Sequence, residues 1–375
     1  MALFSIGRNM NNLSDSVGLN HVRPDVGRPG FHTFVHDSEW IVDQFVELGC
    51  KWNRLAFSWP LVQPEADVFD WELYDRIVDD CAAKGVQIVA TLGGHFDDPA
   101  VPAWAGTSLK DVVNHHPEHQ DRFVEAWVKR YKDRITYWEI LNEPKVHHKG
   151  LTVVEYCEKV LRPANAIVKS LDSNAKTLAC AYNNLPVVGE RIEFWDAARG
   201  HYDILNHHQY DSWGMFRTEV LPNADVAETQ AFRDIADANG EADKPIWITE
   251  MGWWGTGSLT DTVFDTYKQF PGLWTPVLAA YTGRELMEHP ILVREDEHRA
   301  RWMEAVCPEL LKIRGCEKIF LWVSMDEFEG GFEPDQLYGR PIPSHDVRPV
   351  DLWGIIGGDK KWKETAHALQ RMLAN

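Results

Sequence analysis

The chain has 375 residues, of which 44% are hydrophobic and 25% are charged, so it can bury a large core and does not resemble a disordered chain. Its formal net charge is −19 and it has no long basic cluster, which argues against a nucleic-acid partner. No apolar run approaches the roughly 18 residues that a membrane span needs, so we expect no membrane partner.

Short apolar runs alternate along the chain with amphipathic helical patterns. The predicted strands are a weak first strand within 2–10, then 51–57, 86–93, 135–141, 177–182, 204–210, 246–251 and 318–324. The predicted helices include 37–48, 70–84, 119–133, 153–171, 227–239, 295–314 and 360–373. Apolar strands covered by amphipathic helices indicate a parallel sheet buried on both faces. Eight such units predict the α/β class and closure into a (β/α)₈ TIM barrel.

The chain shows no internal repeat, no low-complexity segment and no linker rich in Pro, Gly or Ser. We therefore predict a single domain over residues 1–375. Long irregular stretches follow the seventh and eighth predicted strands, at 252–294 and 326–350. Loops of this length are usually functional, and we interpret them as walls of a substrate cleft.

The opening segment, MALFSIGRNMNNLSDS, lacks the basic and then apolar pattern of a secretory leader. We expect a cytoplasmic protein if the chain is complete, whereas removal of a leader would make it secreted or periplasmic. The cysteines show no CxxC or regular spacing, and we expect reduced core residues, which favours a cytoplasmic setting weakly. They are Cys50, Cys81, Cys157, Cys180, Cys307 and Cys316.

Two glutamates close strands that are otherwise apolar, at the strand ends where barrel enzymes place catalytic groups. Glu143 lies in WEILNEP and Glu250 lies in IWITEMGWW. A buried carboxylate there must be paired, protonated or functional, because burial without a partner costs several kcal/mol. We predict that Pro144 ends the fourth strand and keeps Glu143 extended.

The fourth and seventh strands lie three apart on the ring, so the two glutamates can face each other across the barrel mouth. A separation of about 5–5.5 Å would indicate a retaining glycosidase mechanism and roughly 6.5–9.5 Å an inverting one. Glu139 lies four residues before Glu143. We expect Glu139 to be structural, either deeper in the barrel or on its helix-facing side.

The strand-end motifs, taken together, resemble the signature of glycoside hydrolase clan A, from about residue 35 to the C-terminus. NEP ends the fourth strand and TE-x-G the seventh. Segment 51–71 is similar to the clan's second strand and following loop, with its P-E-x-x-x-F-D-W element. DDPAVPAWA at 97–105 is similar to a loop of the β-xylosidase and iduronidase family. HHQY at 207–210 resembles the His-x-Tyr of the cellulase and mannanase family, and LWVS at 321–324 the eighth-strand Trp.

The resemblance implies a retaining β-glycoside hydrolase in which Glu250 is the nucleophile and Glu143 the acid/base. It also implies that Asn142 hydrogen-bonds the sugar 2-hydroxyl. Trp322 would form the floor of the −1 subsite, with a non-proline cis peptide after it.

The resemblance further implies that Arg54 and Tyr210 hold the nucleophile ionised, the Arg by charge pairing. It makes His95 and His208 partners of hydroxyls or carboxylates. Structural alternatives are open for each of these: an ion pair within the barrel for Arg54, core histidines for His95 and His208, and packing alone for Tyr210 and Trp322.

Three adjacent histidine pairs, at 115–116, 147–148 and 207–208, raise the question of a metal. Adjacent residues on a strand point to opposite faces, so one pair rarely binds one ion. The sequence has no HExxH motif, and it has no GxGxxG motif or P-loop. We expect neither a catalytic metal nor another cofactor.

The expected partner is an oligosaccharide or polysaccharide, and the 17 tryptophans suit either the faces of sugar rings or the core. If the two long loops close the cleft into a pocket, exo-action on short oligosaccharides follows. An endo-β-glycanase of the glucanase, xylanase or mannanase type and a transglycosylase are the alternatives. A non-catalytic carbohydrate-binding barrel is less favoured because it needs no pair of glutamates. The sugar, the linkage and the oligomeric state stay open.

Overall fold

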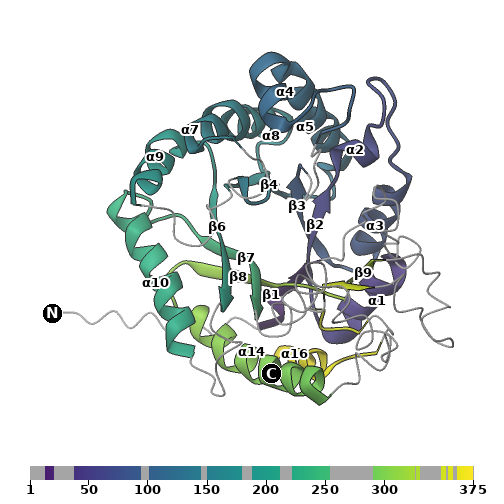
Figure 1. Ribbon diagram of the computed structural model, residues 1–375, viewed down its shortest axis with the longest axis vertical. Coiled ribbons are helices and arrows are strands. Elements are labelled where there is room, and N and C mark those ends of the chain that lie inside the picture. The colour runs from purple at the N-terminus through teal and green to yellow at the C-terminus, as the bar shows by residue number, and fades with distance from the viewer. Residues whose placement is uncertain are drawn as a thin grey trace, which may run out of the picture.

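The computed structural model describes residues 13–20, 38–93, 101–144, 150–179, 188–211, 222–253, 290–325, 327–329, 348–351, 354–357 and 361–374. Within them, parallel strands β1 to β8 form a closed barrel in sequence order, surrounded by helices (Figure 1). The strands are β1 (Val17–Asn20), β2 (Trp52–Phe57), β3 (Gln87–Leu92), β4 (Tyr137–Ile140), β5 (Lys176–Ala179), β6 (Ile204–Asp211), β7 (Ile246–Trp253) and β8 (Cys316–Leu321). The predicted (β/α)₈ barrel is confirmed.

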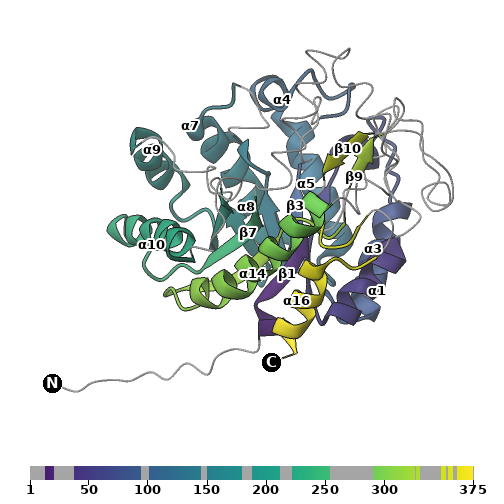
Figure 2. The same ribbon diagram turned by 60° about the horizontal axis from the view of Figure 1, so that its bottom comes forward.

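The helices follow the predicted amphipathic segments, with extra short helices between them. They are η1 (Leu13–Asp15), α1 (Ser38–Leu48), α2 (Trp59–Val62), α3 (Glu72–Ala83), α4 (Leu109–His115), α5 (Pro117–Tyr131), α7 (Val153–Tyr156), η3 (Cys157–Leu161), α8 (Arg162–Leu171), α9 (Val188–Ala198), α10 (Pro222–Ala238), α14 (Pro290–Leu310) and α16 (Glu364–Leu373). Helices α14 and α16 lie side by side against the outside of the barrel (Figure 2). No described helix is both long and apolar enough to cross a bilayer.

The first barrel strand is β1, so the expectation of a first strand within 2–10, which lies outside the described residues, was wrong. The strand has only four residues, VGLN, and all four are buried. A Cβ at Gly18 would lie 2.6 Å from the Cβ of Trp52, so glycine is needed for β1 to approach β2. A glycine and an asparagine in four residues leave too weak an apolar pattern to recognise in the sequence.

An aromatic cluster fills the barrel at the N-terminal ends of the strands. Trp52 opens β2, and Trp247 lies next to it with ring centroids 5.5 Å apart. Tyr137 at the start of β4 lies 5.4 Å from Trp52, and the ammonium group of Lys318 lies 4.5 Å from the centre of the Trp52 ring. Among the described residues these aromatic rings occupy the N-terminal end of the barrel, so we expect a functional site at the opposite end, where the strands finish.

The five described cysteines are all buried free thiols, in agreement with the predicted reduced core residues. Burial raises the pKa of each, for example to about 12 for Cys81. Cys180 lies outside the described residues. Of the predicted loops, 254–289 lies outside them as well, and within 326–350 the structure describes a small antiparallel pair, β9 (Glu327–Glu329) and β10 (Arg348–Asp351).

Candidate active site

The chain leaves β4 through two residues in the left-handed region, Leu141 with φ 66° and Glu143 with φ 41°. The prediction that Pro144 keeps Glu143 extended was therefore wrong. The surroundings fix this conformation: the Leu141 amide donates to the carbonyl of Leu92, and both Asn142 and Glu143 make buried side-chain hydrogen bonds. A non-glycine residue at positive φ costs about 1–3 kcal/mol and persists only where its surroundings over-determine it.

A β-bulge in β7 directs two consecutive side chains into the barrel. Ile248 pairs with His207, but His208 pairs with Glu250, so Thr249 is the extra residue. Both side chains then make hydrogen bonds inside the barrel, Thr249 to His208 and Glu250 to Arg54. In a regular strand, two consecutive side chains would point to opposite faces.

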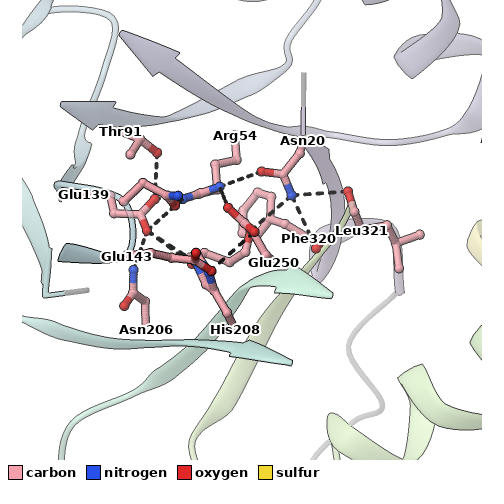
Figure 3. Close-up of polar contacts among 12 residues, drawn as sticks. Asn20, Arg54, Thr91, Glu139, Glu143, Asn206, His208, Glu250, Phe320 and Leu321 are labelled. Carbon is pink, nitrogen blue, oxygen red and sulfur yellow. Dashed lines mark hydrogen bonds and ion pairs between the residues drawn. The ribbon is translucent and has the colours of Figure 1, made fainter. Parts of the chain in front are cut away.

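Arg54 on β2 lies between two buried carboxylates (Figure 3). Its Nε and Nη2 donate to the two oxygens of Glu139 at 2.5 and 3.0 Å, and its Nη1 donates to Glu250 Oε1 at 2.8 Å. It also donates to Asn20 Oδ1 at 2.8 Å and to Asn142 Oδ1 at 2.7 Å. Burial alone would lower the pKa of Arg54, but the two carboxylates raise it above its usual value, so this cation is permanent.

Glu139 lies inside the barrel, below the two strand-end glutamates. Besides Arg54 it accepts hydrogen bonds from Thr91 Oγ1 at 2.7 Å, from Thr249 Oγ1 at 3.2 Å and from the Asn206 amide. Burial raises its pKa, but the charge of Arg54 outweighs this and brings the pKa to about 2. The side chain is a fixed, fully buried anion, in the deeper of the two positions that the sequence allowed.

Glu250 receives a second strong hydrogen bond, from the hydroxyl of Tyr210 on β6 to Oε2 at 2.6 Å. The side chain of Glu250 is only 2% exposed. With Arg54 on Oε1 and Tyr210 on Oε2, each carboxylate oxygen of Glu250 accepts a hydrogen bond.

His208 connects the second glutamate to this network. Its Nδ1 lies 2.7 Å from Glu143 Oε1, and its Nε2 lies 3.0 Å from Thr249 Oγ1. Burial lowers the pKa of His208, but Glu250, Glu139 and Glu143 together raise it to about 9. His207 points the other way and stacks on Phe232 at 4.9 Å, as the alternation of strand side chains predicts.

This pKa predicts a pH dependence of stability. Because the folded pKa of His208 lies above its ordinary value of 6.5, protonation stabilises the fold fully below pH 6.5, and that contribution is lost as the pH rises through about 9. The free energy of unfolding, measured in urea across this window, should fall more steeply in the wild type than in His208→Asn. Parallel curves for the two proteins would contradict the assigned pKa.

The carboxyl groups of Glu143, which follows β4, and Glu250, in the C-terminal half of β7, lie close together. One oxygen of each and one ring nitrogen of His208 all lie within 4.8 Å of one another. Three such atoms could in principle hold a metal ion, and so could those of the more exposed His116, Glu118 and His119. In the first group, His208 Nδ1 is hydrogen-bonded to Glu143 Oε1 at 2.7 Å and lies 3.5 Å from Glu250 Oε2, which is the geometry of a hydrogen-bonded pair beside a second carboxylate.

Two further predicted site residues follow the C-terminal ends of barrel strands, Asn142 after β4 and Trp322 after β8. Asn142 is fully buried, and its Nδ2 has no hydrogen-bond partner among the described residues, so this amide can donate to a ligand. Trp322 follows β8, is 5% exposed and precedes a cis peptide bond to Val323. His95 lies outside the described residues.

The structure adds polar residues that the sequence reading did not place at the site. Asn20 donates to the carbonyls of Thr249 and Leu321 as well as accepting from Arg54. Each added residue is a polar residue within a buried strand. Such residues can be recognised in the sequence, and treating each of them as a candidate for the barrel interior would have identified these positions. They are Asn20, Thr91, Glu139, Asn206 and Thr249.

Comparison with known sequences gives a family match for part of the chain. The model of glycosyl hydrolase family 1 matches residues 18–188. A 6-phospho-beta-glucosidase of Clostridium longisporum is 26% identical over 125 residues, 32% of this chain and 24% of that protein. An aryl-phospho-beta-D-glucosidase of Bacillus subtilis (strain 168) is 30% identical over 117 residues, 29% of this chain and 23% of that protein. The chain thus spans about a quarter of the length of these relatives.

Solved structures are similar over nearly the whole fold. GH5_18 from Streptomyces cattleya, in complex with Manb1-4GlcNAc, has a TM-score of 0.64 at 15% identity, covering 96% of this chain and 80% of that one. A family 39 glycoside hydrolase from Bacteroides cellulosilyticus WH2 has a TM-score of 0.59 at 15% identity, covering 96% and 63%. At this identity the structures show the fold alone. Together with the family match, they confirm the resemblance to the (β/α)₈-barrel glycosidases of clan A that the strand-end motifs predicted.

Proposed function

We propose that the protein is a retaining β-glycoside hydrolase, with Glu250 as the nucleophile and Glu143 as the acid/base. The observation that carries the proposal is the approach of their carboxyl oxygens to within 4.8 Å. This distance, between one oxygen of each group, is nearer to the roughly 5–5.5 Å that separates the carboxyl groups of retaining glycosidases than to the roughly 6.5–9.5 Å of inverting ones. The opposite environments of the two groups also suit two different roles.

In the first step, a Glu250 oxygen bonds to the anomeric carbon as the glycosidic C–O bond breaks, and Glu143 gives its proton to the leaving oxygen. In the second step, water loses a proton to Glu143 and attacks the same carbon, which releases Glu250. Arg54 and Tyr210 donate to Glu250 at 2.8 and 2.6 Å. They orient its oxygens for attack and stabilise the carboxylate again as it leaves.

The remaining roles concern the sugar. The donor group on Asn142 that lacks a partner among the described residues supports a hydrogen bond to the 2-hydroxyl, which would strengthen as positive charge develops on the ring. We assign Trp322 to the floor of the −1 subsite and His95 to a sugar hydroxyl. The whole chain, residues 1–375, would form one catalytic domain.

For the substrate we propose a short β-linked oligosaccharide cleaved from its end. The curated relatives include proteins named beta-glucosidases and phospho-beta-glucosidases, and one similar structure is named an exo-beta-1,4-mannosidase. An endo-β-glycanase and a transglycosylase stay the alternatives. The buried thiols favour a cytoplasmic enzyme, and the net charge of −19 disfavours nucleic acid as a partner.

The test is a panel of aryl β-glycosides (glucoside, mannoside, xyloside, galactoside and fucoside), with the anomer of the first-formed sugar read by NMR. We expect release of the aryl group with retention for at least one sugar. Inversion would overturn the double displacement, and no turnover on the panel or on β-linked oligosaccharides would overturn the hydrolase. A disaccharide should be cleaved much faster than a long β-glucan, and comparable rates would refute exo-action. Added acceptor sugars diverting the product would identify a transglycosylase.

Tyr210→Phe should lower kcat/KM on the preferred aryl glycoside by about 10–100-fold, because a hydrogen bond to a charged group contributes about 1.5–3 kcal/mol. The matched control is Tyr131→Phe, which removes a buried tyrosine's hydrogen bond to Asp75 on the outside of the barrel. That control should keep wild-type kinetics. Equal effects of the two variants would mean that the Tyr210 hydroxyl serves stability and not the reaction.

A further inference from the structure

A line of hydrogen bonds runs from the proposed acid/base down into the barrel. Glu143 Oε1 lies 2.7 Å from His208 Nδ1, and His208 Nε2 lies 3.0 Å from Thr249 Oγ1. Thr249 Oγ1 in turn donates to Glu139 Oε1 at 3.2 Å. His208, Glu139 and Thr249 are fully buried, so no bulk water completes the hydrogen bonding of these groups.

Glu139, the last residue of this line of hydrogen bonds, determines which atom donates and which accepts in each bond. Glu139 is an anion bound to Arg54 on both oxygens, so it only accepts. The single hydroxyl hydrogen of Thr249 therefore points at Glu139, and the Thr249 oxygen can only accept from His208. His208 Nε2 consequently carries a hydrogen in either protonation state, and its Nδ1 is left to share one proton with Glu143.

We propose that Thr249 and Glu139 are positioning residues for the acid/base: they fix the tautomer of His208 so that the one exchangeable proton of the His208–Glu143 pair stays available at Glu143. This rests on the proposed function of the site. The β7 bulge is what makes it possible, because it lets Thr249 point inward beside Glu250. A general acid must hold its proton at the operating pH. The hydrogen bonds from His208 through Thr249 to Glu139 meet this requirement by fixing the tautomer of His208.

Three glutamates face His208. Glu143 follows β4, Glu139 lies on β4 itself at 3.9 Å from Nε2, and Glu250 on β7 lies 3.5 Å from Nδ1. Arg54 partly offsets two of these anions through its bonds to Glu139 and Glu250, and the Tyr210 hydroxyl donates to Glu250. The raised pKa of His208 agrees with a pair that keeps its proton near neutral pH, although the two groups titrate as one unit.

The experiment replaces Thr249 with valine, which has nearly the same shape but cannot accept from Nε2. The alkaline limb of the kcat/KM profile should then move down by about one pH unit, because the protonated pair loses one of its hydrogen bonds. For a glycoside with a poor leaving group, kcat/KM should fall by about tenfold or more, while a 2,4-dinitrophenyl glycoside, which needs little acid assistance, should change by less than about twofold. A merely structural role would lower both substrates alike and leave the pH limb in place.

Thr91 supplies the matched control. Its hydroxyl also donates to Glu139, at 2.7 Å, but the two ring nitrogens of His208 bond to Glu143 and Thr249 instead. Whatever Thr91→Val does to the overall rate through Glu139, it should therefore leave the alkaline limb and the leaving-group dependence in place, and Thr249→Ser should restore them. If Thr91→Val shifts the alkaline limb as much as Thr249→Val does, tautomer control by Thr249 is wrong.

A readout without substrate separates this inference from the proposed function. Imidazole ¹⁵N NMR, recorded above the pKa of about 9 where His208 is neutral and with its signals assigned by their loss in His208→Asn, should show hydrogen on Nε2 in the wild type and a shift of hydrogen toward Nδ1 in Thr249→Val. An unchanged tautomer overturns the inference even if the enzyme is an active glycosidase. A changed tautomer in a protein that cleaves no β-glycoside would instead overturn the function and keep the geometry.

Discussion

Glu250→Ala should lower kcat on the preferred aryl β-glycoside by on the order of 10⁴–10⁶-fold, because no other group can form the covalent intermediate. Glu250 is the carboxylate that accepts hydrogen bonds from both Arg54 and Tyr210. Initial rates, with wild type and Tyr131→Phe alongside, measure the loss.

Azide then distinguishes the two glutamates. In Glu250→Ala, azide can occupy the vacated space and attack from that face, so the product should be the α-glycosyl azide, with the aryloxide as leaving group. In Glu143→Ala the glycosyl-enzyme still forms from an activated substrate, and azide should give the β-glycosyl azide. Wild-type-like rates in either alanine variant would place the chemistry elsewhere in the chain.

Arg54→Met should destabilise the fold by about 3–5 kcal/mol, the usual cost of leaving buried charges without their partner. The substitution keeps much of the side-chain length but removes the guanidinium that bonds to both Glu139 and Glu250. Urea unfolding followed by tryptophan fluorescence gives the free energy of unfolding. Removing one of the two anions as well, in Arg54→Met/Glu139→Gln, should recover part of the loss.

The control for this prediction is an ion pair at the surface. Arg130 pairs with Asp75, and their side chains are 37% and 27% exposed. Arg130→Met should cost no more than about 1 kcal/mol, because water screens and replaces such pairs. A loss below about 1 kcal/mol in Arg54→Met as well would contradict the buried network described for the site.

The regular helices and strands could be predicted from the sequence because their buried positions recur as apolar residues at fixed spacing. Seven of the eight strands and the main helices were expected close to where they occur, since apolar residues recur along each. Strand β1 escaped because four residues with Gly18 carry almost no periodic signal. The alternation that located the strands also predicted correctly that His207 and His208 face opposite ways.

The site was harder to predict where the backbone departs from regularity. An inserted residue such as Thr249 leaves no mark in the sequence, so two inward side chains in succession were not expected. The positive φ of Glu143 opposes the local preference before proline, and only the surrounding tertiary contacts fix it. Glu139 was expected to be structural, and its position is clear only once Arg54 is seen to bridge it to Glu250.

The aromatic packing around Lys318 lies at the end of the barrel remote from the two glutamates. Residues that stabilise the fold there are therefore separate from those proposed for the reaction. Trp52, Trp247 and Tyr137 contact one another there, and within the part of the chain that the structure describes their ring contacts do not include Glu143 or Glu250. Changes at this end can therefore raise or lower thermal resistance while turnover stays constant. Evolution, or an engineer, can adjust durability at one end of the cylinder and selectivity at the other almost independently.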